Sequence, residues 1–172
     1  MPRGEIGELV GHSPVIMEGH YKRPQQTAAA EWFDASGKRF IRTGDIGRFD
    51  EDGFLVLMDR KKDMIISGGF NIYPSDLEAI LAEHDAVAEA SVVGVPSERW
   101  GETPVAFVVV RQGHTIAADD IREWVGGRVG KTQRLAAVEI IPTLPCSAIG
   151  KALKRELRAK YLRPGRDDLA GR

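Results

Sequence analysis

The sequence predicts an α+β protein in which a small β-rich N-terminal piece precedes a compact domain with a three-stranded sheet flanked by helices. Up to residue 61, short apolar segments separated by glycine and proline are typical of strands and turns. Residues 59–63 are five consecutive charged residues, which usually form a solvated turn and here suggest a boundary between two packing units. Residues 63–163 then alternate in the order β, α, β, β, α, β, α, which is typical of an α+β domain.

The N-terminal piece is expected to combine one helix with several short strands. Residues 24–33 suit a short helix, because proline at a first helical position and the alanines after it favour one. Residues 40–42 are predicted to form a short strand that ends at residues 43–45. Residues 46–58 are predicted to form a β-hairpin whose four-residue loop contains Gly53.

The compact domain is expected to hold three main strands and three helices. The strands are apolar and rich in β-branched residues, and they comprise residues 87–95, 105–110 and 137–141. The helices carry their apolar residues on one face, and they comprise residues 74–83, 118–129 and 151–163. Before the first helix, residues 64–66 suit a short strand and residues 67–71 a flexible, glycine-containing loop.

Composition excludes several classes of protein. The 172 residues are 42% hydrophobic and 28% charged, with a formal net charge of −1, so no global field attracts nucleic acid or anionic lipid. Cys146 is the only cysteine, which rules out an intrachain disulfide and suits a reducing cytoplasm; we expect it to be a passive small residue. No apolar run approaches the roughly 20 residues that a membrane span needs.

The segment 144–151 has the features of a shaped loop. Pro145 restricts the backbone and Gly150 frees it, which together indicate a defined turn. Lys151 follows at the junction with the last helix, where a lysine can be directed as a point charge onto a phosphate or carboxylate oxygen. From this segment alone, an ordinary surface lysine after a turn is the more common outcome.

Several motifs in one order and spacing resemble the carboxyl-terminal part of the adenylate-forming enzymes, with acyl-CoA synthetases as the nearest branch. They are Thr43-Gly44-Asp45, Asp59 to Gly69, Asn71-Ile72-Tyr73-Pro74, Val93-Gly94-Val95-Pro96, Trp100-Gly101-Glu102, Pro145 to Lys151 and Arg155-Glu156-Leu157. The resemblance implies that an acyl-adenylate forms from a carboxylate and ATP, with magnesium, and that the acyl group passes to the thiol of coenzyme A. It also implies that the carboxyl-terminal domain is a lid that rotates between the two half-reactions.

The resemblance assigns roles in adenylation and rotation to four residues. Lys151 resembles the adenylation lysine, whose ammonium would contact the carboxylate and the α-phosphate. Asp45 and Arg60 resemble the pair that reaches the ribose of ATP; their alternatives are a turn-capping carboxylate and a solvated charge. Lys62 lies where the family places its hinge.

Three further residues resemble the coenzyme A channel. Gly68 and Gly69 resemble the loop that lines the pantetheine tunnel, and their alternative is an ordinary turn. Trp100 lies where some members stack the adenine of coenzyme A, and its alternative is a half-buried core residue. The basic face of the last helix could meet coenzyme A phosphates, although a solvated face is at least as common.

The resemblance also implies a division of the chain and a missing partner. Residues 1–61 would be the last β-rich portion of a large adenylation domain, residues 62–164 the mobile lid, and residues 165–172 a frayed tail. The missing N-terminal adenylation domain would supply the phosphate loop, the acyl pocket and the magnesium site, so we expect no metal ligand here and no activity from these residues alone. The expected substrate is a fatty or aromatic carboxylic acid. The alternatives are an adenylation module that loads a carrier-protein thiol, or a non-catalytic interaction domain.

Overall fold

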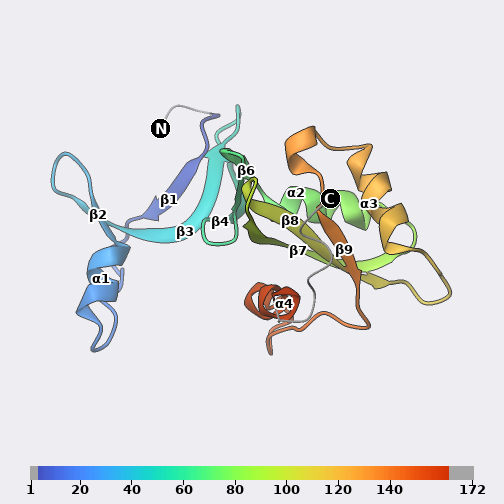
Figure 1. The fold of residues 1–172 in the computed structure, drawn as a ribbon. Coiled ribbons are helices and arrows are strands. Elements are labelled where there is room, and N and C mark those ends of the chain that lie inside the picture. The colour runs from blue at the N-terminus through green and yellow to red at the C-terminus, as the bar shows by residue number, and fades with distance from the viewer. Residues whose placement is uncertain (1–3, 163–172) are drawn as a thin grey trace. The chain divides into compact units, whose positions relative to one another are not determined.

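The chain separates into two compact units, Met1–Lys62 and Asp63–Arg172, and the computed structural model describes residues 4–162. Each unit contains its own sheet together with at least one helix (Figure 1), so the predicted α+β class is confirmed. The expected tail at residues 165–172 and the end of the closing helix at Arg163 lie outside the described residues.

The first unit is built around one long antiparallel strand. The elements are β1 (Gly7–Gly11), α1 (Pro24–Ala30), β2 (Glu31–Phe33), β3 (Arg39–Phe49) and β4 (Leu55–Arg60). Strand β1 pairs with one edge of β3, while β2 and β4 share the opposite edge. The predicted hairpin is present, because Phe49 pairs with Leu55 across the loop of residues 50–53.

Two N-terminal predictions are wrong in extent. The helix predicted over residues 24–33 ends at Ala30, because Glu31–Phe33 pairs with β3 and Trp32 packs edge-on against Phe40 at 5.3 Å. The strand predicted to end at residues 43–45 continues to Phe49, because β1 and β4 both pair with its second half. Pairing with the distant strands β1 and β4 thus outweighs the tendency of Gly44 to end a strand.

The second unit is a five-stranded sheet covered by helices. The elements are β5 (Ile65–Ser67), β6 (Phe70–Ile72), α2 (Pro74–Ala82), β7 (Val87–Ser97), β8 (Gly101–Val110), α3 (Ala118–Gly126), the 3₁₀ turn η1 (Lys131–Gln133), β9 (Ala137–Ile140) and α4 (Lys154–Tyr161). Strand β8 pairs antiparallel with β7 on one edge, and with β5 and the parallel β9 on the other. Strand β7 is therefore an edge strand.

The sheet buries a separate core on each face. Alternating residues of the long strands point to opposite sides, so Val92 joins one core and Val93 the other. Helices α2 and α3 contribute Leu77, Leu81 and Ile121 to the first core, and α4 contributes Leu157 to the second. Figure 1 shows α2 and α3 on one side of this sheet and α4 on the other.

The predicted three-stranded sheet is wrong in strand number, because two short strands extend it to five. Residues 67–71 were expected to be a flexible loop, but Ser67 pairs with Phe70 and the two glycines between them form the tight turn of the β5–β6 hairpin. The closing helix begins at Lys154 instead of Lys151. Segments as short as β5 and β6 cannot show an alternating apolar pattern in the sequence. They still form strands when the edge of a neighbouring strand is available for pairing.

Candidate functional site

Lys151 lies on a closed loop between β9 and α4. An isolated antiparallel bridge joins Cys146 to Ala152 at the base of the loop. Inside it, the Ser147 N–H donates to the Lys151 carbonyl at 2.8 Å, and the Lys151 N–H donates to Ser147 Oγ at 3.2 Å. The Gly150 N–H also donates to the Ser147 carbonyl at 2.9 Å. The lysine therefore stands on a hydrogen-bonded turn with a defined backbone.

The side chain of Lys151 is exposed, and within residues 4–162 it forms no ion pair. Other cations that follow it in the sequence differ in this respect. Lys154 pairs with Glu78 at 2.9 Å, and Arg158 pairs with Glu102 at 3.6 Å. Two of the basic residues on the closing helix thus bind carboxylates of their own unit, while the Lys151 ammonium remains available to an external anion.

Asp45 and Arg60 come together in the first unit. They face each other across β3 and β4, and Arg60 Nε donates to Asp45 Oδ1 at 2.9 Å. Their side chains remain 33% and 54% exposed, so both still offer hydrogen-bonding atoms to solvent or to a ligand. Adjacent to them, the Thr43 hydroxyl accepts from the Asp45 N–H and donates to the Leu9 carbonyl, which fixes the backbone before the carboxylate.

Gly68 and Trp100 come together in the second unit. The Gly68 N–H donates to the Trp100 carbonyl at 2.8 Å, and a Cβ on Gly68 would stand 2.8 Å from the indole ring. Gly68 and Gly69 have φ values of +56° and +83°, which glycine adopts without strain. Arg99 stacks over the Trp100 ring, with its guanidinium carbon 4.7 Å from the ring centroid. Only glycine allows the hairpin turn to approach this half-exposed ring so closely.

Lys62 is the last residue of the first unit, and its side chain is exposed without an ion pair inside residues 4–162. The residue before it is held firmly. The Lys61 N–H donates to the Gly44 carbonyl at 2.9 Å, and Lys61 Nζ lies 2.9 Å from Glu8 Oε2. The same Glu8 oxygen accepts from Arg42 at 2.9 Å. The hydrogen bonds of the first unit therefore extend to the residue that precedes Lys62.

The ion pairs of Glu8 make a testable contribution to stability. Lys61 and then Arg42 donate hydrogen bonds to the carboxylate and lower the pKa of Glu8 below its ordinary 4.5, against the opposing effect of burial. A lowered folded-state pKa gives a stabilisation that is complete above about pH 4.5 and is lost as the pH falls through the folded value.

Glu8→Gln should therefore destabilise the protein by about 1 kcal/mol at pH 7, a discounted value because both cations are more than a third exposed. Chemical denaturation from pH 7 to pH 3 checks this, with the difference from the wild type expected to shrink toward the acid end. A difference that persists unchanged at pH 3 would show that packing, and not charge, explains the loss.

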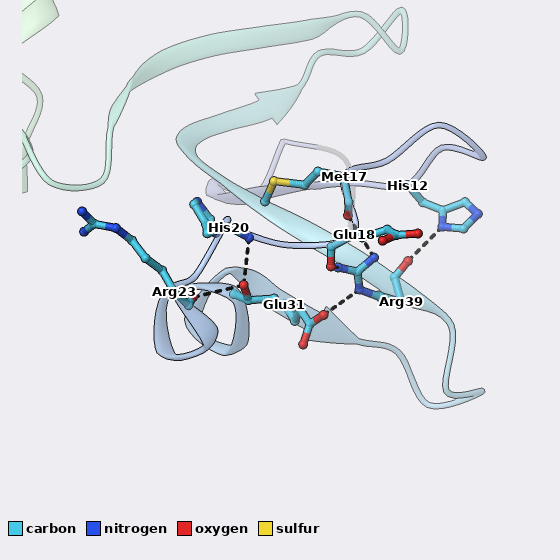
Figure 2. A network of polar contacts seen from close by, with 8 residues as sticks. His12, Met17, Glu18, His20, Arg23, Glu31 and Arg39 are labelled. Atoms are coloured by element: carbon cyan, nitrogen blue, oxygen red, sulfur yellow. Dashed lines mark hydrogen bonds and ion pairs between the residues drawn. The ribbon is translucent and has the colours of Figure 1, made fainter.

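A second polar network holds the irregular segment that precedes α1 (Figure 2). Arg39 donates to Glu31 at 2.7 Å and to the carbonyls of Met17 and Glu18 at 3.2 and 3.0 Å. A pocket of about 510 Å³ lies beside it, between residues 18–23 and the start of α1. None of the residues predicted from the sequence lines this pocket, so pocket and predicted site are separate features.

Neither a metal site nor a membrane span is found in the described part of the chain. Residues 4–162 contain no group of three or more His, Cys, Asp or Glu side chains that could hold a metal ion. No helix within the same residues is long and apolar enough to cross a membrane.

Sequence reasoning missed the two carboxylates that organise the second unit. Glu78 on α2 and Glu102 on β8 each accept a hydrogen bond from a backbone N–H of a strand. Each also forms an ion pair with a basic side chain of α4. Glu102 belonged to a recognised motif, but its partners are separated from it by tens of residues. Glu78 had no local signal beyond its position in an amphipathic helix.

Comparison with known proteins agrees with this fold. Residues 76–151 match the AMP-binding enzyme C-terminal domain family. The 2-succinylbenzoate–CoA ligase of Geobacillus kaustophilus is 42% identical over 90% of this chain, and the long-chain-fatty-acid–CoA ligase of Bacillus subtilis is 39% identical over 89%. The ATP-bound crystal structure of MatB from Rhodopseudomonas palustris superposes on 94% of this chain with a TM-score of 0.85 and 34% identity.

The chain spans only 30% and 26% of the two ligases and 31% of the MatB chain. The shared part contains both compact units, since about nine-tenths of this chain is matched in each comparison. Residues 76–151 therefore belong to the AMP-binding enzyme C-terminal domain family, and the chain as a whole is similar to part of the CoA ligases.

Proposed function

We propose that this chain acts in an AMP-forming acyl-CoA synthetase, which activates a fatty or aromatic carboxylic acid with ATP and transfers the acyl group to coenzyme A. The observation that carries the proposal is the Lys151 loop, which presents an exposed ammonium on a closed turn without an acidic partner in residues 4–162. Such a group suits two anions that must approach each other, here the carboxylate and the α-phosphate.

In this proposal the ammonium of Lys151 offsets the charge that develops on the phosphate oxygens during attack. No general base is required, because a carboxylate is already ionised at neutral pH. Asp45 and Arg60 fit the ribose of ATP: one carboxylate oxygen accepts from Arg60, and the other makes no hydrogen bond inside residues 4–162, so it can accept from a diol. Magnesium would be held by residues outside those described.

The second half-reaction is assigned to the β5–β6 turn and the neighbouring Trp100 of the second unit. Gly68 and Gly69 lack side chains and therefore suit the close passage of a narrow pantetheine arm. Trp100 is half-exposed, and its indole suits stacking with the adenine of coenzyme A. We propose that residues 1–61 belong to the large adenylation domain and residues 62–164 to a lid that turns about Lys62. The whole enzyme would act in the cytoplasm, with the large N-terminal domain as the partner of these residues.

A graft tests the proposal directly. The C-terminal part of the Geobacillus kaustophilus ligase would be replaced by this chain, with the junction placed where the two sequences begin to align. The graft should restore 2-succinylbenzoate-dependent ATP–pyrophosphate exchange and thioester formation to a ligase that lacks its own C-terminal part. The 172-residue chain alone should show neither reaction, because it lacks the remaining 70% of that relative.

The matched control is a graft of the corresponding part of the Bacillus subtilis ligase at the same junction, which shows whether the junction itself is tolerated. If the control graft is active while a folded graft of this chain supports neither half-reaction, the proposed function is wrong. ATP–pyrophosphate exchange by the isolated chain would contradict the proposal that a large N-terminal domain is required for activity.

A further inference from the structure

A single carboxylate joins the two helical layers of the second unit at the exposed edge of its sheet. Glu78 Oε1 accepts from the Val92 N–H at 2.8 Å and from the Ser91 hydroxyl at 3.4 Å, on the edge strand β7. The same oxygen lies 2.9 Å from Lys154 Nζ. Because α2 covers one face of the sheet and α4 the other, Glu78 connects them around the edge of β7.

The cation of this pair occupies an unfavourable helix position. Lys154 is the first residue of α4, where the helix dipole disfavours positive charge. Its side chain is nevertheless only 20% exposed, and that of Glu78 26%. A lysine that is largely buried at a helix N-terminus needs its partner carboxylate, because removing that partner leaves a charge without compensation.

Lys154 also ends the stem of the Lys151 loop. The Leu153 N–H donates to the Pro145 carbonyl at 2.7 Å and closes this stem. On one side the chain enters the loop from Leu144, which is buried in the second core. On the other side it leaves through Lys154, three residues after Lys151. Two anchors of different kinds, one apolar and one ionic, therefore hold the two ends of the loop.

We propose that Glu78 and Lys154 are positioning residues for Lys151. Their ion pair fixes the C-terminal end of the loop against β7, so that the Lys151 ammonium is presented in one place. The inference rests on the proposed function of Lys151 in adenylation. It predicts that loss of this pair slows the adenylation step while the thioester-forming step is unaffected.

The chain supplies a matched control in the second ion pair of the same helix. Arg158 NH2 lies 3.6 Å from Glu102 Oε1, one turn further along α4. Glu102 Oε2 accepts from the Ile66 N–H at 3.2 Å, so this pair supports the strand before Gly68 and not the Lys151 loop. Arg158→Met removes an α4 ion pair without touching the loop.

The experiment uses the active graft described above. Lys154→Met and Glu78→Gln should each slow ATP–pyrophosphate exchange by about tenfold or more, mainly in kcat, since misplacement of a reacting group has effects of this size. Conversion of supplied acyl-adenylate to thioester should be unchanged. Lys154→Arg, which keeps the charge, should restore most of the exchange rate, and Arg158→Met should leave exchange at the parental level.

Hydrogen exchange on the 172-residue chain gives a readout that is independent of catalysis. Lys154→Met should accelerate exchange at the Ser147 and Leu153 amides, which close the loop and its stem, while the amides of β9 keep their protection. Arg158→Met should leave both loop amides unchanged.

Three results would overturn the inference. They are equal losses from Lys154→Met and Arg158→Met, equal losses in both half-reactions, or a Lys154→Met graft with normal exchange activity. Lys151→Ala in the same graft separates this failure from a failure of the proposed function. If Lys151→Ala abolishes adenylation and Lys154→Met does not affect it, only the positioning role is wrong.

Discussion

Lys151→Ala is expected to reduce ATP–pyrophosphate exchange by about 10²–10³-fold in the active graft, the loss typical of removing one preorganised group that stabilises developing charge. The variant should convert supplied acyl-adenylate to thioester at nearly the parental rate, because in the proposed second pose the lid has turned and Lys151 no longer lies at the α-phosphate. Separate assays of the two half-reactions measure both values.

The structure also provides a control for the loss of a positive charge. Lys160 is exposed on α4 and lies outside the Lys151 loop, so Lys160→Ala should leave ATP–pyrophosphate exchange unchanged. A structural role for Lys151 would be indicated by parallel losses in both half-reactions, or by a lowered thermal midpoint that accounts for them. The fold gives no reason to expect destabilisation, because the side chain is exposed and unpaired within residues 4–162.

Lys62→Pro should impair thioester formation by about 10²-fold, the scale of loss expected when a reacting group is misplaced, and adenylation by much less. Proline fixes φ at one value, so a hinge that must adopt two backbone conformations would be held in one. The preceding residue cannot compensate, because Lys61 is held by the Gly44 carbonyl and by Glu8.

Lys62→Ala is the control for this variant, since alanine removes the charge and keeps the backbone free. It should behave like the parent in both assays. Single-turnover measurements of each half-reaction in the graft give the comparison. Equal losses from Lys62→Pro in both steps would remove the hinge interpretation, and a matching loss from Lys62→Ala would assign the effect to the side chain.

Local signals in the sequence were enough to predict the class of fold and the position of Lys151. The turn formed by Pro145 and Gly150 and the hairpin around Gly53 depend on residues that are neighbours in the chain. Backbone preferences act over such short distances, which is why these features can be predicted without tertiary contacts.

The arrangement of the other candidate residues could not be predicted in this way. Asp45 and Arg60 are 15 residues apart, and they meet because of the register between β3 and β4, which shifts between Ile46 and Gly47. A shift of one residue would turn each side chain to the other face of the sheet. The contact of Gly68 with Trp100 likewise depends on the pairing of β5 with β8.

The order of the main strands and helices, the hairpin around Gly53, and a lysine after a shaped loop could all be predicted from residues that are close together in the chain. Tertiary contacts were needed to show that two short strands join the sheet, that Asp45 binds Arg60, and that Glu78 holds Lys154 at the edge of β7. These contacts depend on which strand edges and helix faces meet, and that choice is made by burial of the two cores across the whole second unit and by strand pairing in the first.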